Sequence, residues 1–420
     1  MAAPHPFRIH NFRAYWVARF CTTIGFTALT LVLGWQVYGL SRQTMSIHDA
    51  AFQLGLIGAV QFVPLLLLTP IVGLVADSFD RRWIARTTTS VLMATAGLLA
   101  WLSFAGGITL PILFGAAAVL GVTRAFAGPA YSALAPNLVP RESLPTAIAL
   151  SSIAWQVGSI AGPSLGGALL VLGPQVAYGT SATLMAIALV AVFLIGAVPH
   201  PPVQTDRRPL TRIIDGFAYV RSNRLVLATI TLDLFAVLLA GATALLPVYA
   251  RDILHVGPHG LGLLSSAMGA GAAVVAVLFS VRPLRHDVGN KMLLAVIIFG
   301  AAILCFGLSR SLWLSVAALA VAGAADMVSV YIRQSLIQLH TPDDMRGRVG
   351  AVSQLTISAS NELGEFESGM AAWLLGPVGA VVAGGAAAIA ITLAWARLFP
   401  ELRLAKTFDP PENAHPQPAE

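Results

Sequence analysis

Two related stretches, LVPRESLPTAIALS at Leu138–Ser151 and LHTPDDMRGRVGAVS at Leu339–Ser353, decide the fold of this 420-residue chain. A shift of 202 residues lays the first stretch over the second and aligns identical residues in and beyond them. The aligned pairs are Pro140 with Pro342, Ser151 with Ser353, Gly162 with Gly364, and Gly167 with Gly369. A slightly different shift places LGL at 54–56 on LGL at 261–263. These matches predict that the chain is a duplication of one unit.

Apolar runs of helix length surround both copies. Hydrophobic residues make up 57% of the chain and charged residues 10%, whereas about 25% of a soluble domain is charged. This chain has too few charged residues to cover the surface of a soluble protein. We therefore expect its apolar surface to face lipid. The runs lie near 14–40, 52–75, 85–106, 110–133, 147–172, 176–198, 225–250, 259–281, 291–309, 311–335, 349–374 and 377–397. We therefore expect an all-α membrane protein with twelve transmembrane helices in two pseudo-symmetric six-helix halves.

The same runs divide the chain into four parts. An N-terminal six-helix half covers residues 1–198, and a C-terminal six-helix half covers 225–400. A polar segment at 199–224 joins them, and we expect it to be a cytoplasmic linker. The tail at 401–420 is polar and rich in proline, so we expect it to be disordered. Two halves related by an axis along the membrane normal are typical of transporters, with the substrate site at their interface.

The basic residues predict the orientation of the chain. With both termini placed in the cytoplasm, 20 of the 25 Lys and Arg residues fall on or near the cytoplasmic side. Only Arg42, Arg251 and Arg310 fall outside, and Arg124 and Arg333 lie within helices. Because positive charge favours cytoplasmic loops, this asymmetry predicts both termini inside. It also explains the net charge of +6 without a nucleic-acid partner.

Charged residues inside the spans are the candidates for the substrate or proton pathway, because each costs about 3 kcal/mol or more at mid-bilayer. These candidates are Arg19, Arg124, Asp233, Asp326, Glu362 and Glu365, and the same search also gives Arg333 and Glu367. Arg19 lies near the cytoplasmic start of the first run, so a side chain that snorkels to the membrane surface is its alternative. The 202-residue shift places Arg124 on Asp326. Glu362 and Glu365 share one helix face, and two poorly solvated carboxylates so close favour one bound proton between them. The alternative is a permanent ion pair of Asp326 or Asp233 with Arg124 or Arg333.

Three further motifs resemble the major facilitator superfamily over nearly the whole chain, and most closely its branch of bacterial exporters that includes the enterobactin (siderophore) exporter. GLVADSFDRRWI resembles the superfamily loop signature, at Gly73, Asp77, Arg81 and Arg82. GVTRAFAGPA resembles the element of the fourth helix, at Arg124 and Gly128. GSIAGPSLGG resembles the exporter element of the fifth helix, at Gly158, Gly162, Pro163, Gly166 and Gly167. The second copy of the loop signature, near VRPLRHDVGNK, departs from the pattern.

The resemblance implies roles for these residues. Asp77 and the loop arginines would form a cytoplasmic gate that breaks as the halves rock, although solvated loop charges are the simpler alternative. Gly158, Gly162 and Gly166 lie four residues apart, and small residues at that spacing let helix backbones approach closely. Pro163 removes a backbone hydrogen bond and permits a kink. The exporter element would then act as a hinge, although ordinary tight packing accounts for the same spacing.

We therefore expect a secondary active transporter that exports a siderophore or drug-like amphipathic molecule by alternating access and proton antiport. A proton-symport importer of a nutrient and a transport-inactive membrane receptor are the alternatives. No H-E-x-x-H and no phosphate-binding G-x-x-x-x-G-K-[ST] occurs in the sequence. GPSLG at 162–166 matches G-x-S-x-G in letters, but it lies inside an apolar run of helix length and not at the strand-to-helix turn of a nucleophile elbow. We therefore expect neither an enzyme nor an ATP-driven pump. We expect no cofactor or metal, and a monomer in a bacterial inner membrane whose partners are lipid, protons and a small-molecule substrate.

Overall fold

The computed structural model describes residues 5–196, 209–343 and 345–409, and these residues form helices and no strand. The long helices of the N-terminal half are α1 (His10–Thr44), α2 (Ile47–Ser78), α3 (Arg81–Ala105), α4 (Leu110–Leu134), α5 (Leu144–Leu170) and α6 (Pro174–Phe193). Those that follow are α7 (Pro209–Ser222), α8 (Arg224–Leu239), α10 (Gly257–Val281), α11 (Val288–Leu308), α12 (Leu312–Leu339), α13 (Arg346–Leu398) and α14 (Pro400–Leu404). Short 3-10 turns at Pro6–Arg8, Ala135–Asn137 and Arg141–Ser143 complete the N-terminal half.

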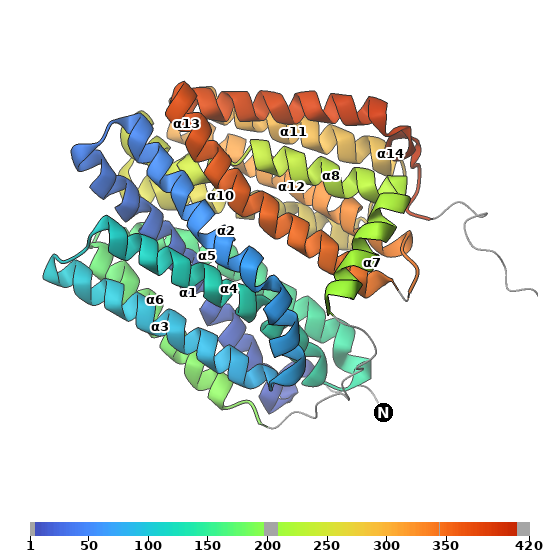
Figure 1. Ribbon diagram of the computed structural model, residues 1–420, viewed down its shortest axis with the longest axis horizontal. Coiled ribbons are helices and arrows are strands. Elements are labelled where there is room, and N and C mark those ends of the chain that lie inside the picture. The colour runs from blue at the N-terminus through green and yellow to red at the C-terminus, as the bar shows by residue number, and fades with distance from the viewer. Residues whose placement is uncertain (1–4, 197–208, 344, 410–420) are drawn as a thin grey trace, which may run out of the picture.

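Eleven of the described segments are long and apolar enough to cross a membrane. The last of them, α13, is two helices that meet at Gly376, where φ is +74°. Glycine tolerates this left-handed conformation, and Pro377 disfavours a helical conformation in the residue before it. The expected twelve crossings in two six-helix halves are therefore confirmed (Figure 1).

The seventh crossing is interrupted, where the sequence predicted one run at 225–250. Helix α8 ends at Leu239, and a 3-10 turn η4 (Ala242–Leu245), a short α9 (Leu246–Val248) and a π-helical turn η5 (Tyr249–Ile253) follow it. The apolar composition continues through the break, so hydropathy does not reveal it. The break places backbone polar groups in the interior, which a membrane protein tolerates only where protein or a cavity covers them.

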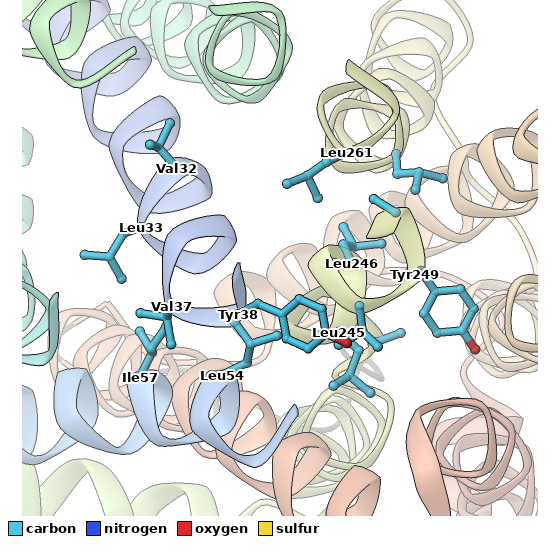
Figure 2. Packing of buried hydrophobic residues seen from close by; sticks show 14 of the residues in the cluster. Val32, Leu33, Val37, Tyr38, Leu54, Ile57, Leu245, Leu246, Tyr249 and Leu261 are labelled. Carbon is cyan, nitrogen blue, oxygen red and sulfur yellow. The ribbon is translucent and has the colours of Figure 1, made fainter. Parts of the chain in front are cut away.

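The buried cores distinguish the two ends of the bundle. We call the end that holds the α1–α2 turn and Gly376 the far end, and the end that holds the start of α1 and α7 the linker end. At the far end one apolar cluster joins both halves, with Tyr38 and Leu54 from the first half near Leu245, Leu246 and Leu261 from the second (Figure 2). The clusters nearer the linker end each belong to one half. The two halves are therefore closed on each other at the far end.

Two glycine contacts hold this closed end together. A Cβ on Gly167 of α5 would lie 2.5 Å from Gly262 Cα of α10, and a Cβ on Gly55 of α2 would lie 2.6 Å from Gly369 Cα of α13. The sequence repeat had paired Gly167 with Gly369, and the LGL match pairs Gly55 with Gly262. The two glycine contacts are thus pseudo-symmetric copies of each other, and each joins opposite halves.

Polar contacts across the halves accompany the glycines. Arg42 Nε of α1 lies 3.1 Å from Asp252 Oδ2 of η5, and the Tyr38 hydroxyl donates to the same carboxylate. Trp373 Nε1 of α13 donates to Asp49 Oδ1 of α2 at 3.0 Å. These contacts place the interrupted seventh crossing and α13 against α1 and α2 at the far end.

The segments outside the crossings are more ordered than expected. The predicted linker contains α7, whose Gly216 packs so closely on α13 that a Cβ would lie 2.7 Å from the Arg348 carbonyl oxygen. Helix α14 extends from Pro400 into the tail that was predicted to be disordered at 401–420, and Leu402 is buried there. The amide of Gly289 donates to the Ala405 carbonyl at 3.0 Å. Residues 197–208 and 410–420 lie outside the described residues.

Candidate functional site

A cavity of about 240 Å³ lies at the interface of the two halves. Helix α4 contributes Arg124 from the N-terminal half, and α8, the break after it and α13 contribute the other residues. The lining residues are Arg124, Val237, Gly241, Thr243, Asn361, Glu362 and Glu365. The cavity therefore combines three charged side chains, an amide and a hydroxyl, between apolar crossings.

An ion pair between the halves forms one wall of the cavity. Arg124 Nη1 contacts Glu362 Oε1, and the Glu362 side chain is only 3% exposed whereas the Arg124 side chain is 42% exposed. A buried carboxylate is costly unless it is paired, so Arg124 stabilises the charged form of Glu362. The sequence had aligned Arg124 with Asp326, but its partner in the structure is Glu362.

Glu365 is the second carboxyl of the cavity. It lies three residues after Glu362 on the same face of α13, and its side chain forms no hydrogen bond or ion pair with the residues that the structure describes. Helix α2 packs tightly behind both carboxyls, because a Cβ on Gly58 would lie 2.7 Å from Glu365 Cβ and 2.6 Å from the Glu362 carbonyl. One arginine thus faces two glutamates, and this arrangement provides for one bound proton or one further cation.

The break after α8 brings its backbone against these glutamates. A Cβ on Gly364 would lie 3.0 Å from the Val237 carbonyl oxygen, and a Cβ on Gly241 would lie 2.6 Å from the Gly364 carbonyl oxygen. Both glycines are therefore needed for this approach. The sequence aligned Gly364 with Gly162 but gave no reason to select Gly241, Thr243 or Asn361.

Asp233 lies apart from the cavity, in a buried ion pair inside the C-terminal half. Asp233 Oδ2 of α8 contacts Arg333 Nη1 of α12, and both side chains are buried. The pair joins these two helices. This is one of the ion pairs that the sequence left open as an alternative to proton coupling, and whether it persists through transport stays a prediction. Breaking such a pair leaves an uncompensated charge and costs about 3–5 kcal/mol.

Asp326, Glu367 and Arg19 also lie outside the cavity lining. All three are half-buried, and none has an ion pair with the described residues. Of the six pathway candidates, the structure therefore brings together Arg124, Glu362 and Glu365. It separates Arg19, Asp233 and Asp326 from them.

The α2–α3 connection holds an interaction that the sequence reasoning missed. Asp80 caps α3 by accepting from the Arg82 amide at 2.9 Å, and its Oδ2 lies 2.6 Å from Arg82 Nη2. Arg82 also donates to the Ile195 carbonyl at 3.3 Å. An aspartate one residue before a helix is a typical N-cap, so the position of Asp80 could have indicated this contact from the sequence. The surroundings of Gly73 and the side chain of Asp77 lie outside what the structure describes, and the predicted gate stays a prediction.

The exporter glycines divide between two neighbours. Gly158, Gly162 and Gly166 face α1, where a Cβ on Gly158 would lie 2.8 Å from Thr23 Cβ and one on Gly166 would lie 3.2 Å from Ala28 Cα. These three contacts lie within one half and fit the tight-packing interpretation. Gly167 alone faces the opposite half, and the Pro163 carbonyl lies 3.0 Å from a Cβ built on Gly262.

Comparisons with known proteins agree with this architecture. The profile of a family described as transmembrane secretion effector matches residues 1–419. The enterobactin exporter of Citrobacter koseri is 28% identical over 401 residues, which cover 93% of this chain and 92% of that protein. The enterobactin exporter of Escherichia coli O1:K1 is 29% identical over 380 residues, covering 88% and 86%.

Solved structures support the fold alone. A bacterial homologue of the human lysosomal transporter Spinster, in an inward-facing and occupied conformation, superposes with a TM-score of 0.74. It is 15% identical, and the match covers 95% of this chain and 99% of that one. A D-xylose–proton symporter superposes with a TM-score of 0.71 at 14% identity, covering 93% and 98%.

Proposed function

The chain belongs to the transmembrane secretion effector family of the major facilitator superfamily, and on that premise we propose that it exports a siderophore or a similar amphipathic molecule by proton antiport. The matched relatives are named enterobactin exporters, which makes a catecholate siderophore the first candidate. The linker end is the cytoplasmic end in this proposal, because the basic residues concentrate there. The cell inner membrane is the location that this implies.

The ion pair of Arg124 with Glu362 is the observation that carries the proposal. It joins the two halves across the cavity, so the halves cannot separate there without breaking or replacing it. The deprotonated carboxylates of this cavity can accept hydrogen bonds from hydroxyl groups of the substrate. A proton on the carboxyl pair removes that acceptor and weakens the hold of Arg124, so proton and substrate compete for one site, as antiport requires. Protonation, substrate binding and movement of the halves are linked through one contact.

Glu365 extends this coupling. Arg124 balances the charge of only one of the two carboxylates. The pair can therefore take up one proton without a change in the charge of any other residue. A proton that arrives from the far end would occupy this pair, and release to the linker end would restore the ion pair with Arg124. Such an exchange is alternating access at a site between two halves.

The gate residues complete the proposed cycle. Arginine–carboxylate contacts would close the linker end in the predicted gate of Gly73, Asp77, Arg81 and Arg82. The glycine contacts between the halves would then open at the far end. Gly167 with Gly262 and Gly55 with Gly369 are the contacts that must separate for release. The other exporter glycines, which pack within one half, would move together with α1.

The test uses inside-out membrane vesicles, in which export appears as accumulation. Radiolabelled catecholate siderophores and cationic dyes are supplied with and without a proton gradient. We expect siderophore accumulation that falls when the gradient is collapsed and that Glu362→Gln abolishes. Glu367→Gln is the matched control, because Glu367 lies on the same helix outside the cavity. Accumulation that is independent of the gradient contradicts antiport, and accumulation only in right-side-out vesicles supports the importer alternative.

A further inference from the structure

Arg19 of α1 is a membrane-embedded cation that the proposed cycle does not use. Its side chain forms no hydrogen bond or ion pair with any residue that the structure describes, and its Nε is buried without a partner. It lies nine residues after the start of α1, about 14 Å from the linker end at 1.5 Å per residue. A charge left unpaired in such a place is costly and marks a functional position.

The helices of the N-terminal half offer Arg19 few counter-ions. Helices α1, α3, α4, α5 and α6 contain no Asp or Glu. The acidic residues of α2 are Asp49 and Asp77, which lie near its two ends. In contrast, the C-terminal half holds Glu362, Glu365 and three other membrane-embedded carboxyls. The N-terminal half therefore presents positive charge to its interior without balancing it.

Polar side chains of α1, α3, α4 and α5 form a cluster beside Arg19. It lies close enough to Tyr15 and Tyr131 to interact electrostatically with both. The Tyr15 hydroxyl donates to the Tyr131 carbonyl at 3.1 Å, and the Tyr131 hydroxyl lies 3.2 Å from Thr89 Oγ1. Ser151 of α5 is only 8% exposed, and its hydroxyl lies beside that of Tyr15. Buried polar groups are rarely left unsatisfied, so the unpartnered Nε of Arg19 beside these hydroxyls points to a missing ligand.

We propose that Arg19 and Ser151, beside Tyr15 and Tyr131, bind a carboxylate or phenolate group of an anionic substrate before it reaches Arg124. The inference rests on the proposed function in one respect, because an exported molecule must arrive from the linker end. The guanidinium pairs with the anion, and the Ser151 hydroxyl donates to it. The site is distinct from the cavity, whose lining does not include Arg19.

The experiment measures the affinity of the purified full-length protein for 2,3-dihydroxybenzoate and for neutral catechol by titration calorimetry. The wild type should bind the benzoate at least about tenfold more tightly, since a hydrogen-bonded charge contributes that much. Arg19→Gln should remove this preference and leave catechol binding unchanged, whereas Arg19→Lys should keep part of it. Arg13→Gln, an exposed position on the same helix, should bind like the wild type.

Ser151→Ala provides an independent arm, because it removes one hydroxyl and keeps the charge. It should weaken benzoate binding severalfold at an unchanged melting temperature. An unchanged benzoate preference in folded Arg19→Gln, or equal affinities for both probes in the wild type, overturns the proposal. Should Arg19→Gln fail to fold, full wild-type affinity in both Arg19→Lys and Ser151→Ala overturns it. Binding needs no gradient, so a wild type that binds but does not transport contradicts the export proposal and not this site.

Discussion

Adding one carbon to a glycine at the far end should push the transporter toward the state that is open there. Gly167→Ala places a Cβ 2.5 Å from Gly262 Cα and 2.7 Å from its nitrogen, and Gly55→Ala places one 2.6 Å from Gly369 Cα. Carbon atoms in contact normally lie about 3.5–4.0 Å apart. Because the neighbours are backbone atoms, the helices themselves must separate by about 1 Å.

The size of the effect follows from the cost of overpacking, which is about 1–3 kcal/mol. That cost arises only while the far end is closed, so it shifts the equilibrium between the two states by roughly 5- to 150-fold. Gly121→Ala is the matched control. Its Cβ would lie 2.6 Å from the Gln61 carbonyl oxygen, which is equal crowding, but α2 and α4 belong to the same half.

The assay is a distance measurement between spin labels at Gln43 and Arg310, which are exposed on opposite halves near the far end. Cys21 and Cys305 are first replaced so that only these positions react. We expect Gly167→Ala and Gly55→Ala to lengthen the distance and Gly121→Ala to leave it at the wild-type value. Equal shifts in all three variants, or no shift in any, would refute the reasoning.

Three further predictions concern single ionic groups. Asp233→Asn should destabilise the protein by about 3–5 kcal/mol because Arg333 is left buried and unpaired, and a thermal melt should show the loss; an unchanged melting temperature argues against the buried pair. Asp252→Asn removes the half-buried contact with Arg42. It should change the free-energy difference between the closed and open far end by at most about 1 kcal/mol, so the spin-label distance should shift less than in Gly167→Ala, and a larger shift contradicts this expectation. Asp77→Asn should abolish vesicle transport while the protein remains in the membrane by immunoblot, and normal transport counts against the gate.

Much of the fold was predictable because duplication and hydropathy act over the whole chain. The alignment of Gly167 with Gly369 and the two LGL triplets predicted equivalent positions in the two halves. In the structure these glycines form the two close helix contacts between the halves. Gly376 followed by Pro377 lies between the last two apolar runs, so the turn in α13 also agrees with the sequence. Apolar spans must be helical in lipid, which leaves few alternatives.

The candidate site was predictable in part. The sequence identified Arg124, Glu362 and Glu365 because charges inside apolar spans are rare. It did not identify the pairing, since Arg124 aligns with Asp326 but contacts Glu362 from the opposite half. Which helix faces meet across an interface depends on packing between distant segments, and no local periodicity encodes it.

The break after α8 escaped prediction for a different reason. Ala240, Gly241 and Ala242 are apolar or small, and they continue the hydropathy of a spanning helix. The helix ends there because Gly241 and Gly364 allow two backbones to meet. That contact belongs to the tertiary structure.

Proton movement driven by substrate tests the central claim most directly. Purified protein is placed in liposomes that contain a pH-sensitive dye, and a gradient of a catecholate siderophore is imposed without any other driving force. The account predicts a proton flux opposite to the substrate, absent in Glu362→Gln and normal in Glu367→Gln. Substrate movement without proton flux, or an undiminished flux in Glu362→Gln, would contradict it.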